Sequence, residues 1–247
     1  MSAELLLIDF SSIARPIWEV AQSSSNARAS VADGIVQRVH ALASQHPHAA
    51  ICCDSGKCFR HDLMPDYKGS RPERDAAMLH QFDVAAERLK ADGFAVWSAK
   101  GFEADDVICA ATKAILKMDG AVLVVSSDKD LLQLVGDGVR VKSATSGNIA
   151  DSAAVVEKFG VQPAQILDYL TLVGDASDEV RGAKGIGPKN AASLLATFGT
   201  IEAIYAAIDK GEAKLTNGIA QSLVEFRDRW PLVRQVIALR DDIDLPL

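Results

Sequence analysis

Apolar and polar positions in the first 150 residues follow strand and helix periods in turn. Continuous apolar runs predict strands over 4–8, 48–54, 94–99 and 121–127, and helical spacing of apolar residues predicts helices over 30–44, 75–92 and 103–117. The run AVLVVSS at 121–127 is typical of a strand that is buried on both faces. The alternation predicts an α/β fold with a central, mainly parallel sheet and flanking helices.

The pattern changes to mostly helix from about residue 151. Short helices that stop at or near glycine are predicted over 153–160, 163–174, 190–199 and 201–209. We therefore predict a domain over 1–150 that holds the sheet and a helical region over 151–247.

Carboxylates gather where the predicted strands end. Asp9, Asp54 and Asp128 each close an apolar run, and parallel strands present their carboxyl ends at one edge of a sheet. Such a density of acids is costly unless cations neutralise it, so we predict two or more hard divalent ions. Sites of this kind hydrolyse phosphodiesters between two ions. The nine clustered acids are Asp9, Asp54, Glu103, Asp105, Asp106, Asp128, Asp130, Asp175 and Asp178.

The acids at 103–106 also have a simpler interpretation. On a helix, Glu103 and Asp106 share a face while Asp105 points about 100° away. Acids in a first turn also suit the helix dipole, which explains this cluster equally well when it is taken alone. Asp128 and Asp130 close a buried strand, so a surface-loop explanation is weaker for them.

A second signal lies at 174–191, GDASDEVRGAKGIGPKNA. Gly185 and Gly187 lead into Pro188 at a helix start, followed by Lys189, which is a helix–hairpin–helix pattern. Backbone amides at such a helix start hold phosphates without reading bases. A plain turn between helices is the alternative, but the position directly after Asp175 and Asp178 favours DNA.

The segment 58–74, CFRHDLMPDYKGSRPER, interleaves cations with an aromatic. Its cations can hold phosphates while Tyr67 stacks on a base. Acids are interspersed, so a solvated loop remains an alternative. The cations are Arg60, Lys68, Arg71 and Arg74.

Totals change this picture little. The net charge is −7, but setting the nine clustered acids aside from 33 leaves 24 acidic residues against 26 basic ones, so DNA is not excluded. The four cysteines show no zinc spacing and suggest reduced thiols in a cytoplasmic protein. The start has no basic region typical of a signal peptide, and no apolar run reaches the ~18 residues of a membrane span.

These motifs resemble one family. DSGKCFRHDLMPDYKGSRP, FEADDVI, SSDKDLLQLV and LVGDASDEVRGAKGIGPKNAA are similar to segments of the 5′ nuclease domain of bacterial DNA polymerase I and of flap endonucleases. The resemblance runs from Leu5 to about Leu245, as a stand-alone short form. It implies a PIN-like nuclease core with an arch over about 58–92. It also implies a helix–three-turn–helix over about 163–200 and a C-terminal return to the core.

The resemblance also implies roles for residues. Lys68 stabilises charge at the scissile phosphate, Arg71 assists it, and Tyr67 stacks on a base. The first metal is held or supported by Asp9, Asp54, Glu103, Asp105 and Asp106, and the second by Asp128, Asp130, Asp175 and Asp178. The expected DNA contacts are Arg15, Arg60, Arg74, Arg181, Gly185, Gly187 and Lys189. Two or three Mg²⁺ or Mn²⁺ ions are expected, with K⁺ in the hairpin.

Three positions depart from the family pattern. Glu179 stands where the family usually has Asn, and Val180-Arg181-Gly182 replaces Ile-Pro-Gly. The opening DFSSIAR makes Arg15 an uncertain equivalent of a phosphate-binding arginine. His61 is expected to be structural rather than a general base.

The sequence therefore predicts a structure-specific, metal-dependent 5′ nuclease. It would act on branched or flapped DNA, with RNA/DNA hybrid compatible, in replication and repair. A monomer and a functional link to a DNA polymerase are expected. Two alternatives stay open: a flap-DNA-binding protein with weak or no catalysis, and a PIN-type ribonuclease.

Overall fold

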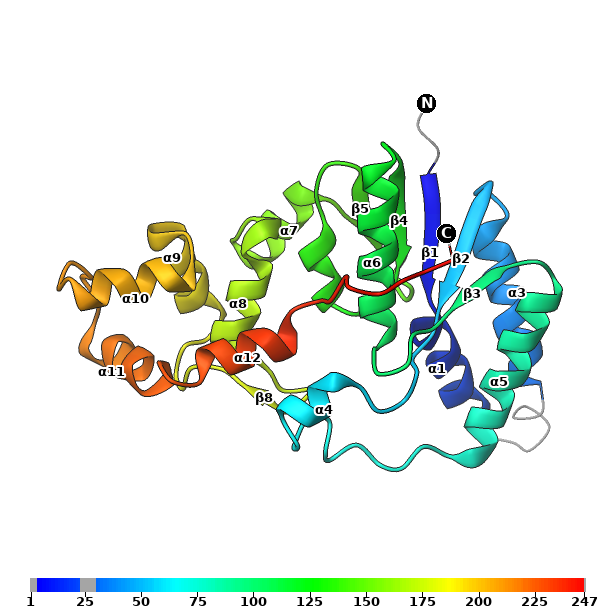
Figure 1. Ribbon diagram of the computed structural model, residues 1–247, viewed down its shortest axis with the longest axis horizontal. Helices are drawn as coiled ribbons and strands as arrows, with labels where there is room; N and C mark the ends of the chain where they lie inside the picture. Colours follow the sequence, from blue (N-terminus) through cyan, green and yellow to red (C-terminus); the bar gives the residue numbers. More distant parts are fainter. Residues whose placement is uncertain (1–3, 23–29, 247) are drawn as a thin grey trace. The chain divides into compact units, whose positions relative to one another are not determined.

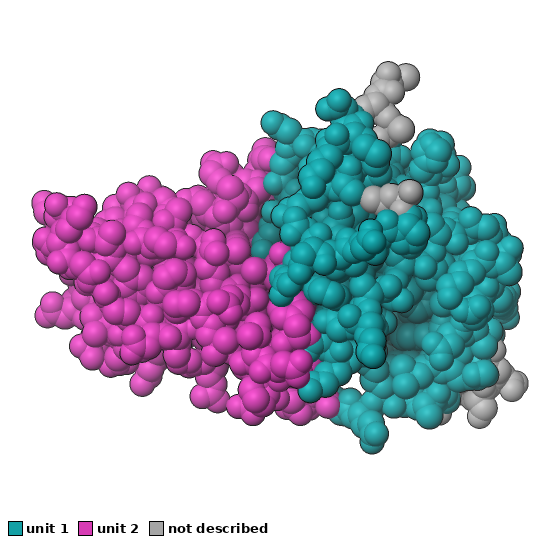
Figure 2. All heavy atoms as spheres, in the orientation of Figure 1, with its two compact units in different colours: residues 1–58, 72–150, 240–247 teal, residues 59–71, 151–239 magenta. Residues whose placement is uncertain are grey.

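The computed structural model describes residues 4–22 and 30–246, which form two compact units. Unit 1 comprises residues 1–58, 72–150 and 240–247, and unit 2 comprises residues 59–71 and 151–239 (Figure 2). The segment 59–71, expected to belong to an arch over the sheet domain, thus groups with the helical unit.

Unit 1 is built on a six-stranded sheet in the order β3-β2-β1-β4-β5-β6 (Figure 1). All neighbouring pairs are parallel except β5 and β6. The α/β class and the mainly parallel sheet are confirmed. The strands are β1 Glu4–Asp9, β2 His48–Cys52, β3 Ala95–Trp97, β4 Ala121–Val125, β5 Val139–Lys142 and β6 Ile149–Ala150.

Side-chain alternation along β1 explains how helices cover both faces of the sheet. Leu6 and Ile8 join one buried cluster with residues of α1, α3 and α5, whereas Leu7 is buried outside that cluster. Helix α6 contacts β1, β2 and β4 and covers the other face. The helices are α1 Phe10–Ala21, α3 Val31–Ala43, α5 Ala76–Ala91 and α6 Ala104–Lys117.

The strand ends lie level with one another. Asp9 pairs with Cys52, and Ile8 pairs with Val125, so β1, β2 and β4 finish at one edge of the sheet. Asp9 then caps α1, with its Oδ1 accepting the N–H groups of Ser11 at 3.0 Å and Ser12 at 3.4 Å. No helix was predicted at this position, although the buried residues of α1 recur at helical spacing.

Unit 2 joins short helices to one small hairpin. Its buried Asp168 ties it together, with Oδ2 accepting the Ile201 N–H at 3.1 Å and Oδ1 accepting the Arg234 Nε–H at 3.0 Å. Hairpin strands β7 Gly174–Asp175 and β8 Val180–Arg181 are antiparallel. The helices are α4 Phe59–Leu63, α7 Ser152–Phe159, α8 Ile166–Val173, α9 Pro188–Phe198, α10 Ile201–Asp209, α11 Asn217–Phe226 and α12 Trp230–Ile237.

Within the described residues, no single helix is long and apolar enough to cross a membrane. Helices α9 and α10 pass that test only as a pair, with a bend of 73° between them. The four cysteines are free thiols, and burial raises the pKa of Cys53 and of Cys109 to about 12. These thiols therefore stay protonated and unreactive at neutral pH.

Candidate metal and nucleic-acid site

Serine hydroxyls hold the buried carboxylate of Asp9 at the end of β1. Its Oδ2 accepts the Ser12 hydroxyl at 2.6 Å and the Ser126 hydroxyl at 2.7 Å. Ser12 also accepts the Ser127 N–H at 3.0 Å, which joins the end of β1 to the end of β4. The burial of Asp9 raises its pKa, although the serine hydrogen bonds oppose that change.

Asp54 joins β2 to the start of α6. Its Oδ1 accepts the Ala104 N–H at 3.1 Å, and its Oδ2 accepts the Ser11 hydroxyl at 3.0 Å. The Arg74 guanidinium lies 3.7 Å from the same Oδ2. Asp54 is thus oriented from three sides at the edge where Asp9 lies.

Asp105 lies among several other acids at this edge. Burial raises its pKa well above the ordinary value, and the negative charges of Asp128, Asp9, Asp130 and Glu103 raise it further. Those charges come from the ends of β1 and β4 and from the start of α6, so unit 1 brings these predicted ligands together.

The carboxylate of Asp106, in contrast, accepts hydrogen bonds from backbone N–H groups. The side chain is fully buried, and its Oδ2 accepts the Glu103 N–H at 3.1 Å in a capping box with the Glu103 side chain. Its Oδ1 accepts the Arg240 N–H at 2.9 Å. Asp106 therefore supports the start of α6 and holds residue 240.

Asp128 and Asp130 follow β4 in a tight turn. The Asp128 N–H donates to the Ser126 hydroxyl at 3.0 Å, and the Asp130 N–H donates to Asp128 Oδ1 at 2.9 Å. Asp128 is exposed, and Asp130 begins the short 3₁₀ helix η1 Asp130–Leu134. The turn keeps both carboxylates at the carboxyl end of the strand.

Unit 2 carries its own pair of buried acids in the β7–β8 hairpin. Asp175 Oδ1 accepts the Ser177 N–H at 2.9 Å and the Ser177 hydroxyl at 2.6 Å. Asp178 is 8% exposed. A Cβ on Gly174 or on Gly182 would lie 2.4 Å from backbone nitrogen of the other, so glycine is required at both positions for this close approach.

The three predicted catalytic residues all bind Asp178. The Tyr67 hydroxyl donates to Asp178 Oδ2 at 2.9 Å, Arg71 Nη2 donates to Oδ1 at 2.5 Å, and Lys68 Nζ lies 3.5 Å from Oδ2. Tyr67 is only 4% exposed, with its ring edge-on to His61. Its ring is therefore not presented for the stacking on a base that the sequence suggested.

Arg60 differs from the other predicted DNA contacts. It is 3% exposed, and its guanidinium donates to the carbonyl oxygens of Val236 at 2.7 Å and Ala238 at 3.2 Å. A buried guanidinium that satisfies backbone carbonyls anchors α4 within unit 2. We therefore assign Arg60 a structural role in place of the predicted phosphate contact.

The hairpin between α8 and α9 presents its basic residues outward. Arg181 and Lys189 are exposed, while Ile186 is buried between them. Gly185 has φ +78°, and Gly187 caps α9 with its carbonyl accepting the Ala191 N–H at 3.0 Å. A glycine turn that leads into a helix start can bind the phosphate backbone of a nucleic acid. Arg15 is partly buried on α1 in unit 1.

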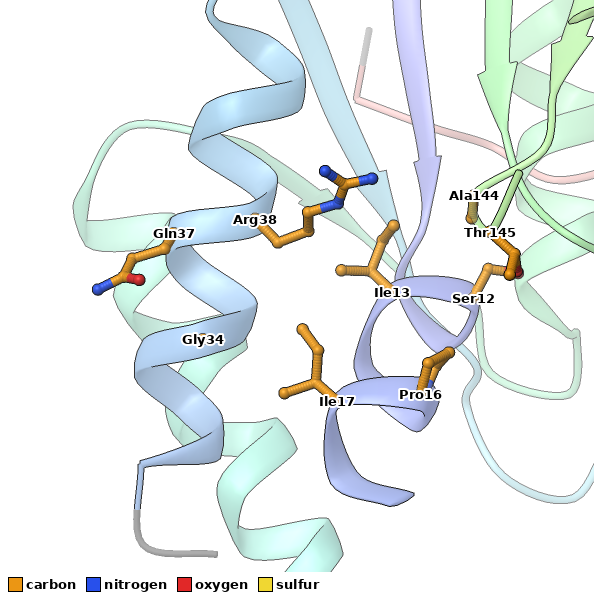
Figure 3. A pocket seen from close by; sticks show the side chains of 9 residues that line it. All are labelled: Ser12, Ile13, Pro16, Ile17, Gly34, Gln37, Arg38, Ala144 and Thr145. Carbon is orange, nitrogen blue, oxygen red and sulfur yellow. The ribbon is translucent and has the colours of Figure 1, made fainter. Parts of the chain in front are cut away.

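A cavity of about 580 Å³ opens beside Ser12 in unit 1. Figure 3 shows the Ile13 and Ile17 side chains between α1 and α3, with Ser12 close to Thr145. Unit 2 contains a groove of about 1170 Å³ lined in part by Asp66, Glu179 and Arg181.

Sequence reasoning missed the serines that organise the acids. Ser11, Ser12, Ser126 and Ser177 each bond a predicted ligand or its turn. The signal was present, because serine stands beside the acids in DFSS, SSDKD and DASD.

The carboxylates and serine hydroxyls at this edge of unit 1 are hard oxygen donors, which suit a divalent cation. Burial and neighbouring negative charges raise the pKa of Asp9 and of Asp105, and a bound cation would oppose this rise by stabilising the ionised carboxylates. Together with a basic hairpin, the fold and the acid edge define a nuclease of the 5′–3′ exonuclease class.

The chain belongs to the 5′–3′ exonuclease family. Residues 4–160 match its N-terminal resolvase-like domain, and residues 161–247 match its C-terminal SAM fold. The chain is 30% identical to the flap endonuclease Xni of Edwardsiella ictaluri, over 99% of this chain and 95% of that protein.

Two further similarities set the scope of this assignment. The chain is 35% identical to DNA polymerase I of Treponema pallidum over 91% of its own residues, and it spans 24% of that protein's length. The solved structure of bacteriophage T5 flap endonuclease, a pseudo-enzyme–product complex with DNA and metal ions, has the same fold. Its TM-score is 0.78 at 22% identity, covering 96% of this chain and 89% of that one.

Proposed function

We propose that this family member is a divalent-metal-dependent 5′ nuclease that cuts branched DNA near the junction between a 5′ single strand and duplex. The substrate proposal is supported by the relative named as a flap endonuclease and by the exposed basic hairpin at 181–189. Sequence-independent contacts suit an enzyme that recognises the shape of a junction.

The observation that carries the proposal is the convergence of carboxylates at one sheet edge. Asp9, Asp54, Asp105 and Asp128 come from three strand ends and one helix start, and serines orient two of them. Protein stability does not need such a cluster, since burial and mutual repulsion raise the pKa of Asp105. Catalysis with divalent ions does.

In this proposal the acids of unit 1, together with Asp175 and Asp178 of unit 2, are metal ligands. Divalent ions held there would supply an activated water and charge stabilisation for the leaving 3′ oxygen. Lys68 and Arg71 bind Asp178 in the absence of DNA. With DNA bound, they stabilise negative charge on the scissile phosphate.

The test is cleavage of a labelled 5′-flap duplex with Mg²⁺ or Mn²⁺, beside EDTA and Asp128→Ala controls. Metal-dependent cutting near the junction that the variant lacks supports the proposal. Tight flap binding without cutting in either metal favours the alternative of a binding protein. Cutting of single-stranded RNA in preference to flap DNA favours a PIN-type ribonuclease.

We extend the proposal to cofactors and partners. Two or three Mg²⁺ or Mn²⁺ ions serve the acids, and K⁺ binds the 182–187 hairpin, which DNA affinity in KCl against NaCl would test. RNA/DNA hybrid as substrate, a functional link to a DNA polymerase and a monomeric state complete the proposal. A cytoplasmic location is supported by four free thiols.

A further inference from the structure

Glu179 adopts a backbone conformation that glutamate does not favour. Its φ is +61°, in the left-handed region, and Lys68 is also left-handed with φ +54°. Asparagine tolerates this region better than glutamate does. A glutamate held there therefore needs side-chain contacts that offset the strain.

The contact of Glu179 is a short hydrogen bond to the turn that carries Lys68. Glu179 Oε2 accepts the Ser70 N–H at 2.6 Å. The neighbouring carbonyl of Asp178 accepts the Lys68 N–H at 3.1 Å. Two successive hairpin residues thus hold the backbone on either side of Gly69.

The β7–β8 hairpin is more closely packed than the 64–71 segment that it contacts. Gly174 and Gly182 approach too closely to admit a Cβ, and Asp175 binds the Ser177 N–H. Residues 64–71, by contrast, form only local turns, such as the bond from the Gly69 N–H to the Asp66 carbonyl at 3.0 Å. An irregular segment with few internal bonds relies on external anchors for a fixed shape.

We propose that Glu179 is a positioning residue whose carboxylate fixes the 66–71 turn, so that Lys68 and Arg71 are held in the orientation required for catalysis. This inference rests on the proposed function, because it concerns the turn that carries the proposed catalytic cations. It also gives a reason for glutamate at a position where asparagine is usual in the family that the sequence resembles. Asn is one methylene shorter and falls short of Ser70.

Three substitutions separate the possible contributions of Glu179. Glu179→Gln keeps the reach and a neutral acceptor, Glu179→Asn favours the backbone conformation but shortens the reach, and Glu179→Ala removes the acceptor. Glu157→Ala, an exposed position on α7 of the same unit, is the matched control. Each variant is assayed by steady-state cleavage of the 5′-flap duplex, which gives kcat and KM, and by hydrogen–deuterium exchange over 64–71 without DNA.

The expected result is a kcat about tenfold lower in Glu179→Ala and Glu179→Asn, with KM nearly unchanged. This loss is smaller than the ~10²-fold cost of a 1 Å misplacement. Both variants should lose exchange protection at Ser70, while Glu179→Gln and Glu157→Ala stay near wild type. The inference is overturned if Glu179→Ala leaves exchange at 64–71 unchanged, or if Glu179→Asn cleaves as fast as wild type.

The exchange experiment keeps the two proposals distinguishable. If wild-type protein cuts no flap DNA, the proposed function fails, yet protection of Ser70 still reports on the bond to Glu179. If wild-type protein cuts and Glu179→Ala loses protection without losing kcat, the positioning role fails while the nuclease assignment stands.

Discussion

The acids of the two units are bound by different kinds of partner. In unit 1, Asp9 is held by serine hydroxyls and backbone amides, and across residues 4–22 and 30–246 no lysine or arginine forms an ion pair with Asp9 or Asp105. In unit 2, Asp178 is bound by Tyr67, Lys68 and Arg71. The negative charges of Asp9 and Asp105 are therefore not offset by a cationic side chain, whereas the charge of Asp178 is.

This difference teaches where an external cation is needed. Hydroxyl groups fix a carboxylate in place but leave its charge available to a ligand, whereas arginine and lysine compete with that ligand. Asp105, whose pKa is raised by burial and by four other acids, gains most from a bound divalent ion.

The largest expected effect is on the acids of unit 1. Asp128→Ala should lower flap cleavage by at least about 10²-fold, the scale of losing one charge-stabilising group in an active site. DNA affinity measured in EDTA should stay within about threefold of wild type, since the exposed hairpin cations supply the phosphate contacts. Asp137→Ala, another exposed acid of unit 1, is the control. Full activity of Asp128→Ala in saturating metal would remove Asp128 from the site.

The second effect concerns the hairpin that supports the acids of unit 2. A Cβ at Gly182 would lie 2.3 Å from the Leu172 carbonyl, so Gly182→Ala should destabilise unit 2 by about 3 kcal/mol. The readout is the urea midpoint, together with hydrogen exchange over 172–182. Gly218→Ala on α11 meets nothing within 4 Å and should be neutral or slightly stabilising. Equal midpoints for the two variants would show that the close approach at Gly182 is not needed.

Periodicity predicted the sheet well because parallel strands are buried on both faces. The runs at 4–8 and 121–127 became β1 and β4, and the acids that end them share one edge as expected. Helix α1 was missed although its buried apolar residues recur at helical spacing and Asp9, where the first strand was predicted to end, caps its start.

Side-chain roles were harder to predict than elements. The sequence around Arg60 does not indicate that its guanidinium is buried and bound by the carbonyl oxygens of Val236 and Ala238, because those residues are far away in the sequence. The same holds for Tyr67, whose hydroxyl is bound by Asp178. Composition identifies a cation or an aromatic, but only the long-range contacts decide whether it faces DNA.

The third effect tests the raised pKa values in unit 1. Because burial raises the pKa of Asp9 and Asp105 above 3.8, the folded metal-free protein retains protons that the unfolded chain releases. Its stability should therefore fall as the pH rises from 3.8 through the raised values. Mg²⁺ at 100-fold its Kd should add about 2.7 kcal/mol at neutral pH, which is a Tm increase of about 5–10 °C.

The measurement is a thermal melt with and without Mg²⁺ at pH 4 and at pH 7.5. The Mg²⁺ gain should nearly vanish at pH 4, where protonated carboxyls cannot bind the ion. Asp105→Asn should stabilise the metal-free protein at pH 7.5 and shrink the Mg²⁺ gain. A gain of equal size at both pH values would show that the acids of unit 1 are not the groups that bind.

The smallest effect concerns Arg74, whose guanidinium lies beside Asp54 in unit 1. Its guanidinium lies 3.7 Å from Asp54 Oδ2 and its side chain is 42% exposed, so Arg74→Ala should change stability by less than about 0.5 kcal/mol. If Arg74 instead contacts a DNA phosphate, the same substitution should weaken flap binding in EDTA by about threefold. It should also reduce the slope of log affinity against log salt by about 1. Arg88→Ala, whose partner is Asp33 on α3, removes an equally exposed cation of unit 1 and should leave both quantities unchanged. If Arg74→Ala and Arg88→Ala show the same slope of log affinity against log salt, Arg74 does not contact a DNA phosphate. Its role is then to neutralise Asp54, which reduces the difference in charge neutralisation between the two units.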